Sequence, residues 1–256
     1  MLLVIDIGNT NTVLGVYEGE ALVTHWRLAT QRDRTVDEYG VLCRTLFSLA
    51  GIDPGRIDGI AVASVVPPLN GVVQAMATQY FGVPARFVEP TMDLGMPVRY
   101  NPPHDVGADR IVNGIAAYAK YGGPAIVADF GTATTFDAIS GAGEYLGGVI
   151  APGVMISAEA LFLRTAKLPR VEVKPPDRVI GTTTVQSMQS GLYFGYLGLV
   201  DGILRRMQSE LGAATVIATG GLAGLIQAGC PQIQHVEDTL TLDGLRIIYG
   251  RMKAKG

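Results

Sequence analysis

The stretch DIGNTNTV, residues 6–13, decides how the chain folds. An apolar run precedes it at residues 1–5 and a second one follows at residues 14–17, so the pattern predicts a β-hairpin with Asp6 at the end of a buried strand. Such a turn offers backbone N–H groups, amides and hydroxyls to one small volume, which suits phosphate oxygens. The Asp6 carboxylate cannot face a phosphate directly, so we expect it to hold a cation, or water around one, that phosphates also contact.

The hairpin is not a P-loop. No G-x-x-x-x-G-K-[ST] string occurs in the chain, and here the loop leads into a strand instead of a helix. A tight hairpin whose Asn and Thr side chains only satisfy the turn is an alternative at this point.

The same order of residue types recurs in the second half of the chain, at residues 125–136 (AIVADFGTATTF). Both stretches read as an apolar strand, an Asp, an apolar residue, a Gly, a cluster of small polar residues and another strand. Asp129 follows Asp6 by 129 − 6 = 123 residues, close to half the chain, which indicates an internal duplication. We therefore predict an α/β fold with two similar domains, residues 1–117 and 118–256, and a nucleotide cleft between them.

Hydrophobic periodicity and turn residues predict a β-β-β-α-β-α order, with additions, in each half. In the first half we expect strands near residues 2–7, 12–17, 21–28, 59–66 and 85–89, and helices near residues 36–50, 69–81 and 105–120. In the second half we expect further strands near 144–151 and 214–219, a helix near 153–166, helices across 183–211 and two more helices after the last strand.

The composition indicates a globular protein with a sizeable core, since 48% of the residues are hydrophobic and 17% are charged. The net charge of −3 and the absence of Lys/Arg runs argue against nucleic acid or an anionic membrane as the main partner. The most apolar long stretch, residues 145–163, contains Pro152, Gly153 and Glu159, so we expect no membrane-spanning helix there. With no signal peptide and two distant cysteines in apolar surroundings, we expect a soluble cytoplasmic protein with free thiols.

Doubled domains of this kind resemble the actin, hexokinase and Hsp70 superfamily of ribonuclease-H-like ATPases, which use two phosphate hairpins and a glycine segment that contacts adenosine. Here the third element would be residues 216–221 (VIATGG), where paired glycines let a flat ring or ribose approach the backbone. An ordinary strand–turn–helix corner is the alternative for this segment taken alone.

A more specific resemblance rests on six motifs that occur in order along nearly the whole chain: DIGNTNTV (6–13), YNPPHDVGADR (100–110), DFGTATTFD (129–137), GGVIAPG (147–153), TTTVQSMQSG (182–191) and ATGGLAG (218–224). Together they resemble type III pantothenate kinase. The resemblance implies phosphoryl transfer from ATP, with Mg²⁺, to the primary hydroxyl of pantothenate, which is the first step towards coenzyme A. It also implies a homodimer and a requirement for a monovalent cation, potassium or ammonium.

The resemblance also implies a role for individual residues. The ATP phosphates would be held by Asp6, Ile7, Gly8, Asn9, Thr10, Asn11, Thr12, Val13 and Thr132, and the monovalent cation by Asp129. Pantothenate would be held by Tyr100, Gly107, Ala108, Asp109, Arg110 and Thr184, with Asp109 as the proton acceptor.

The residue types fit this chemistry, although each has a simpler alternative. Asp109 in the first turn of a helix can accept a proton from an alcohol, or it can merely stabilise the helix start. Arg110 and the Thr182–184 run supply donors to a small anion, or the threonines cap a helix. Asp129 can bind a hard cation beside phosphates, or it can cap a hairpin.

Neither phosphate hairpin contains Lys or Arg. We therefore expect weak ATP binding and a strong need for cations. Two other functions compete with pantothenate phosphorylation. The chain could be a non-catalytic, nucleotide-binding accessory member of the same family, or a kinase for a sugar or a short acid. The apolar stretch 191–204 (GLYFGYLGLVDGIL) is either a core helix or a candidate dimer interface.

Overall fold

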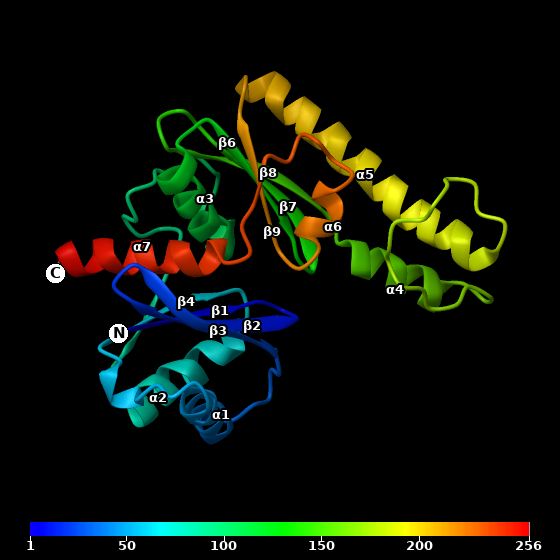
Figure 1. Ribbon diagram of the computed structural model, residues 1–256. Helices are drawn as coiled ribbons and strands as arrows, with labels where there is room; N and C mark the ends of the chain where they lie inside the picture. The colour runs from blue at the N-terminus through cyan, green and yellow to red at the C-terminus, as the bar shows by residue number, and fades with distance from the viewer. Residues whose placement is uncertain (256) are drawn as a thin grey trace. The chain divides into compact units, whose positions relative to one another are not determined.

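The computed structural model describes residues 1–255 (Figure 1). The chain forms two compact units. Unit 1 consists of Met1–Ala116 and the segment that starts at Leu240, and unit 2 consists of Ala117–Thr239. No helix in the described part of the chain is long and apolar enough to cross a membrane.

Unit 1 is built on a five-stranded sheet in the order β3-β2-β1-β4-β5. Its strands are β1 (Leu2–Ile7), β2 (Asn11–Glu18), β3 (Ala21–Ala29), β4 (Gly59–Ser64) and β5 (Ala85–Phe87). The first three strands pair antiparallel, whereas β4 lies parallel to both β1 and β5. The parallel strand β4 is buried along almost its whole length, which explains why its sequence, GIAVAS, is nearly all apolar.

Helices cover both faces of this sheet (Figure 1). On one face, α1 (Val36–Leu49) and α2 (Asn70–Phe81) pack against the odd-numbered residues of β1, namely Leu3, Ile5 and Ile7. On the other face lies α7 (Leu240–Lys255), where Leu242 and Val4 both approach Gly15. The alternation of side chains along β1 thus places one apolar row under each helical layer.

Unit 2 repeats the sheet of unit 1. Its strands are β6 (Ala125–Phe130), β7 (Ala133–Ile139), β8 (Tyr145–Pro152), β9 (Thr215–Thr219) and β10 (His235–Val236), in the order β8-β7-β6-β9-β10. Asp6 pairs with Val13 on the antiparallel side and Ala63 on the parallel side, and Asp129 pairs in the same way with Thr135 and Thr219. The internal duplication is therefore a duplication of topology and register.

The helices of unit 2 are α4 (Val154–Arg164), α5 (Thr184–Leu211) and α6 (Ala223–Gln227). We expected more than one helix across 183–211, but α5 is one continuous helix of 28 residues. Tyr196, Val200 and Leu204 recur every four residues and pack into the core of the unit, so one buried stripe holds the helix together despite its glycines.

The last helix, α7, belongs to a different unit from the one that the predicted domain boundaries gave it. The prediction assigned residues 118–256 to the second domain, whereas α7 packs in unit 1. Leu242, Leu245 and Ile248 of α7 are almost fully buried, and Thr241 donates a hydrogen bond to Asn113 Oδ1 at 2.7 Å. An amphipathic pattern shows that a helix covers a sheet but does not tell which sheet it covers.

Candidate active site

The first hairpin forms as predicted, with Ile7 paired to Thr12 and the loop between them. The Gly8 N–H donates to the Asn11 carbonyl at 2.9 Å, and a Cβ at Gly8 would lie 3.0 Å from that oxygen, so the tight loop favours glycine. Asn9 and Thr10 at the tip are exposed, whereas Ile7 and Thr12 are buried. The tip can therefore present side chains and backbone N–H groups to a ligand, and Ile7 can offer only its backbone.

Thr12 has a structural role beneath the loop. Its hydroxyl lies 2.9 Å from the Thr30 hydroxyl, and the Thr30 hydroxyl lies 2.7 Å from the Gly8 carbonyl oxygen. The Tyr39 side chain is buried in the same layer, and burial raises its pKa while Thr12 and Arg34 oppose the rise. This buried polar layer fixes the loop from below, so the Thr12 side chain supports the loop and does not form its surface.

The second hairpin, between β6 and β7, is held by close glycine contacts. A Cβ at Gly220, whose φ is +90°, would lie 2.6 Å from Asp129 Oδ1 and 2.7 Å from the Phe130 carbonyl oxygen. A Cβ at Gly153 would overlap the Thr132 carbonyl. The glycine segment after β9 and the start of α4 therefore both approach this hairpin, and oxygen atoms of Asp129 and Phe130 lie side by side with Gly220.

Asp109 lies in the first turn of α3 (Ala108–Tyr121), where its carboxylate accepts a hydrogen bond from the Arg110 N–H at 2.8 Å. Burial raises the pKa of Asp109 above its usual value, and the positive charge and N–H of Arg110 oppose the rise. The Arg110 side chain itself is only 7% exposed. A carboxylate with a raised pKa beside a buried guanidinium is a stronger proton acceptor than an exposed aspartate.

Val65 connects this turn with the first hairpin. Its N–H donates to the Ile7 carbonyl at 3.0 Å, and its side chain lies 3.5 Å from where a Cβ on Gly107 would stand. The end of β1 and the Gly107–Asp109 turn are therefore neighbours within unit 1.

A cavity of about 280 Å³ opens in unit 1 beside the same turn. It is lined by the end of β4 and the start of α2 (Ser64, Val65, Pro67, Asn70), by the chain after β5 (Phe87, Val88, Glu89, Pro90) and by the segment before α3 (His104, Asp105, Val106, Gly107, Ala108). Two predicted pantothenate-binding residues, Gly107 and Ala108, therefore border a space of the size that a small ligand occupies.

The remaining predicted contacts lie in different places. Tyr100 is half-buried in the loop before α3. In unit 2, Thr184 is the first residue of α5, and Thr183 caps the helix by accepting from the Gln186 N–H at 3.2 Å. The helix-cap alternative thus holds for Thr183, and the exposed Thr184 lies one residue inside the helix.

Residues 2–206 match the family model described as type III pantothenate kinase. The chain belongs to the type III pantothenate kinase family. It is 58% identical to the type III pantothenate kinase of Koribacter versatilis over 262 residues, which cover 98% of this chain and 96% of that protein. Membership of this family makes the chain a phosphotransferase, and the resemblance seen in the six motifs is confirmed.

Solved structures confirm the fold. The ROK hexokinase of Thermus thermophilus has a TM-score of 0.51 at 11% identity and covers 100% of this chain and 99% of its own. The activator of 2-hydroxyisocaproyl-CoA dehydratase from Clostridium difficile, with bound ADPNP, has a TM-score of 0.57 at 12% identity and covers 99% and 95%. The predicted α/β fold with two ribonuclease-H-like domains is thus confirmed. At such low sequence identity, the similarity concerns the fold alone.

Arg32 lies beside the first hairpin of this type III pantothenate kinase family member, and none of the six sequence motifs contains it. Arg32 Nη2 donates to Asn9 Oδ1 at the hairpin tip, at 3.0 Å. Neither hairpin contains a Lys or Arg, and the positive charge at the tip of the first comes from the connection between β3 and α1. The order of the first three predicted strands could have indicated this position, because antiparallel pairing brings the end of the third strand back beside the first turn.

Proposed function

We propose that the chain transfers the γ-phosphoryl group of ATP to the primary hydroxyl of pantothenate and so forms 4'-phosphopantothenate, the first intermediate of coenzyme A biosynthesis. Membership of the type III pantothenate kinase family is the observation that carries this proposal. The six motifs that support it include every residue for which the resemblance implies a role.

In this proposal Asp109 accepts the proton of the pantothenate hydroxyl as the alcohol attacks the γ-phosphorus. Its place in the first turn of α3, its raised pKa and its hydrogen bond to the Arg110 N–H support this role. Arg110, Tyr100, Gly107, Ala108 and Thr184 bind pantothenate. Gly107 and Ala108 border the cavity in unit 1, which supports a small-molecule site there.

The nucleotide phosphates bind the tip of the first hairpin and Thr132 of the second. Thr10 and Thr132 are exposed at the two loops, which supports contact with a ligand. Asp129 binds potassium or ammonium, and the carbonyl oxygen of Phe130 beside Gly220 supplies a second hard oxygen to that neighbourhood. Mg²⁺ accompanies ATP and neutralises the charge that develops on the phosphates during transfer.

The active form in this proposal is a cytoplasmic homodimer. Most of the apolar side chains in residues 191–204, our first candidate for the interface, are buried in the core of unit 2, including Leu192, Val200 and Leu204. Exposed apolar side chains instead occur on β8, on α4 and in the chain around the start of α5 (Ile150, Met155, Ile156, Leu163, Val179, Ile180, Val185). Exposed apolar side chains favour burial against a second copy, and Thr184 is next to Val185 in the sequence.

The activity is tested by ADP release with pantothenate, glucose, glycerol and acetate as acceptors, at saturating Mg²⁺-ATP and in potassium. We expect turnover with pantothenate only. Preferred turnover of glucose or glycerol would assign the chain to sugar or polyol phosphorylation, and ATP binding without turnover of any acceptor would identify an accessory protein.

The dimer is tested separately by sedimentation of the wild type and of Ile180→Glu, whose parent side chain is 80% exposed. A buried charge at the interface disfavours association. We expect a dimer that dissociates in the variant while the fold, seen by circular dichroism, is kept. A monomeric wild type would contradict the dimer.

A further inference from the structure

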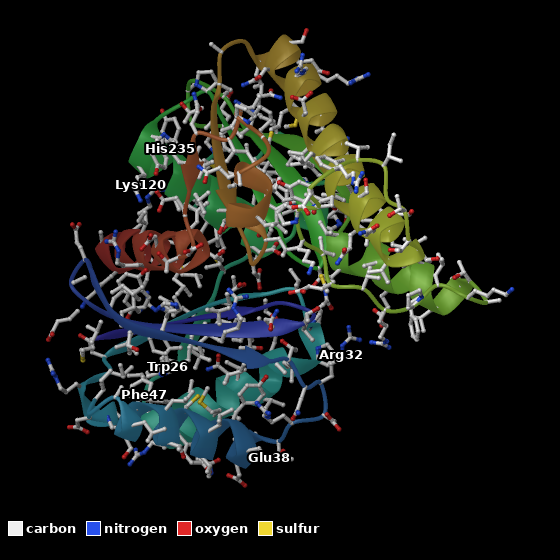
Figure 2. The ribbon with its side chains drawn as sticks, turned by 45° about the vertical axis from the view of Figure 1, so that its right-hand side comes forward. Trp26, Arg32, Glu38, Phe47, Lys120 and His235 are labelled. Atoms are coloured by element: carbon white, nitrogen blue, oxygen red, sulfur yellow. The ribbon has the colours of Figure 1, made fainter. Side chains whose placement is uncertain are left out.

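Positive charge lies beside the tip of the first hairpin, in the connection between β3 and α1. Arg32 in this connection donates to the Asn9 side chain at 3.0 Å, and both side chains are exposed. Figure 2 shows Arg32 at the same end of the sheet as the hairpin tip, far along the sheet from Trp26 and Phe47. The position follows from strand pairing, because Ala29 at the end of β3 pairs with Asn11, and the Thr30 N–H donates to the Thr10 carbonyl at 2.9 Å.

The negative charge of the nucleotide phosphates is stabilised by a positively charged side chain nearby. Neither hairpin carries Lys or Arg, and a triphosphate brings several negative charges to loops whose donors are uncharged backbone N–H groups, amides and hydroxyls. A guanidinium has five N–H donors in a rigid plane, which match phosphate oxygens in pairs. The hydrogen bond to Asn9 uses one of these donors and sets the guanidinium at the rim of the loop, with donors left to bind a ligand.

The neighbouring Arg34 does not serve in the same way. Its Nη2 donates to Gln31 Oε1 at 2.9 Å, and its guanidinium carbon lies 5.2 Å from the centre of the Tyr39 ring, so it packs towards α1 under the loop. Arg34 is half-buried, whereas Arg32 is exposed. Of the two arginines in this connection, Arg32 is the one that a ligand at the hairpin tip can reach.

We propose that Arg32 is a nucleotide-binding residue whose guanidinium, oriented by Asn9, contacts phosphate oxygens of ATP at the first hairpin. This inference rests on the proposed function, since it assumes that ATP phosphates bind this loop. It changes the expectation drawn from the hairpins alone: the protein itself supplies one fixed positive charge, and metal ions supply the rest.

The test compares Arg32→Gln and Arg32→Lys with the wild type, by titration with Mg²⁺-ATP and by steady-state kinetics in both substrates. The control is Arg56→Gln, because Arg56 forms an exposed ion pair with Glu18 at the opposite end of β2 from the hairpin. We expect Arg32→Gln to raise the Kd and KM for ATP about tenfold or more, since a hydrogen bond to a charged group contributes that much to affinity. Arg32→Lys should recover part of the loss, and the KM for pantothenate and the control should stay unchanged.

Salt dependence separates a phosphate contact from a mere brace for the loop. If Arg32 binds phosphate, raising ionic strength weakens ATP binding more in the wild type than in Arg32→Gln. If it only braces Asn9, then Asn9→Ala and Arg32→Gln have equal and non-additive effects, the salt dependence is unchanged and lysine does not rescue. That second pattern, or an unchanged Kd in Arg32→Gln, would overturn the inference, whereas a wild type that binds no ATP would overturn the proposed function itself.

Discussion

Replacing Asp109 by Asn tests the proposed chemistry with the least disturbance to the fold. The Asp109 carboxylate accepts the Arg110 N–H at 2.8 Å, and an amide oxygen can keep this hydrogen bond while it loses the negative charge and the proton affinity. General-base help contributes roughly 10²–10⁴ in rate, or about 3–5 kcal/mol of transition-state free energy. We therefore expect kcat to fall by two to four orders of magnitude, roughly, with little change in the KM for either substrate.

The pH dependence gives a second measure of the same carboxylate. Because burial raises the pKa of Asp109, the acid limb of the wild-type rate profile should lie above the usual pKa of an aspartate, 3.8. Since the base must be ionised to accept a proton, the rate rises as the pH rises through this raised pKa. In Asp109→Asn that limb should disappear and leave a low, flat profile over the same range.

The effect on stability has a definite sign. A pKa that is higher in the folded state than in the unfolded chain means that the carboxyl group favours folding below its ordinary pKa, and this contribution is lost as the pH rises through the raised value. At pH 7 the neutral amide should therefore melt at or above the wild-type Tm, and the difference should shrink in acid. A lower Tm at pH 7 would mean that the folded state favours the charged carboxylate.

The control for this series is Asp238→Asn, an exposed aspartate in the chain between β10 and α7 that does not line the cavity beside α3. It should leave kcat, the pH profile and the Tm unchanged. An unchanged kcat in Asp109→Asn would reassign the base, and a raised KM for pantothenate at constant kcat would make Asp109 a binding residue.

Three further predictions concern the two hairpins. Gly220→Ala places a Cβ against Asp129 at a positive φ, so it should lower the free energy of unfolding by roughly 1–3 kcal/mol and raise the KM for ATP. The control is Gly221→Ala, whose new Cβ would have nothing within 4 Å and which should leave chemical denaturation almost unchanged. Activity should appear in potassium or ammonium and be low in sodium alone, and equal rates in all three salts would remove Asp129 as a monovalent-cation site. Thr12→Val removes a buried hydrogen bond to Thr30 and should cost about 1 kcal/mol in urea unfolding, with a loosened ATP site; full retention of stability would contradict the supporting layer.

The sheets could be predicted from the sequence because their signals are local. β1 and β6 are apolar runs that end in Asp-x-Gly, and the register that pairs Ile7 with Thr12 follows from the loop length. The spacing of the two aspartates then predicts that the second sheet repeats the first. The length of α5 could not be predicted, because its glycines indicate breaks that the buried stripe of Tyr196, Val200 and Leu204 overrides.

The last helix and the cation at the first hairpin depend on contacts between distant parts of the chain. Assigning α7 to unit 1 requires knowing that Leu242 meets Val4 across Gly15, and that the Tyr17 hydroxyl donates to Asp243 at 2.6 Å over a separation of 226 residues. Periodicity carries no information at that range. Residue roles in the candidate site were likewise predictable only as motifs, and the motif does not show that Thr12 is buried beneath the loop.

The two hairpins share a topology but are supported differently, and this difference suits them to different kinds of ligand. Hydroxyls of Thr12 and Thr30 support the first loop from below and Arg32 stands at its rim, so its free surface carries donors and positive charge. The second loop is closed in by Gly220 and has the Asp129 carboxylate and a carbonyl oxygen beside that glycine, so its surroundings carry acceptors. Donors suit phosphate oxygens and acceptors suit cations. The first hairpin is therefore suited to an anion and the second to a cation, and exchanging the two loop sequences should abolish activity while both sheets still fold.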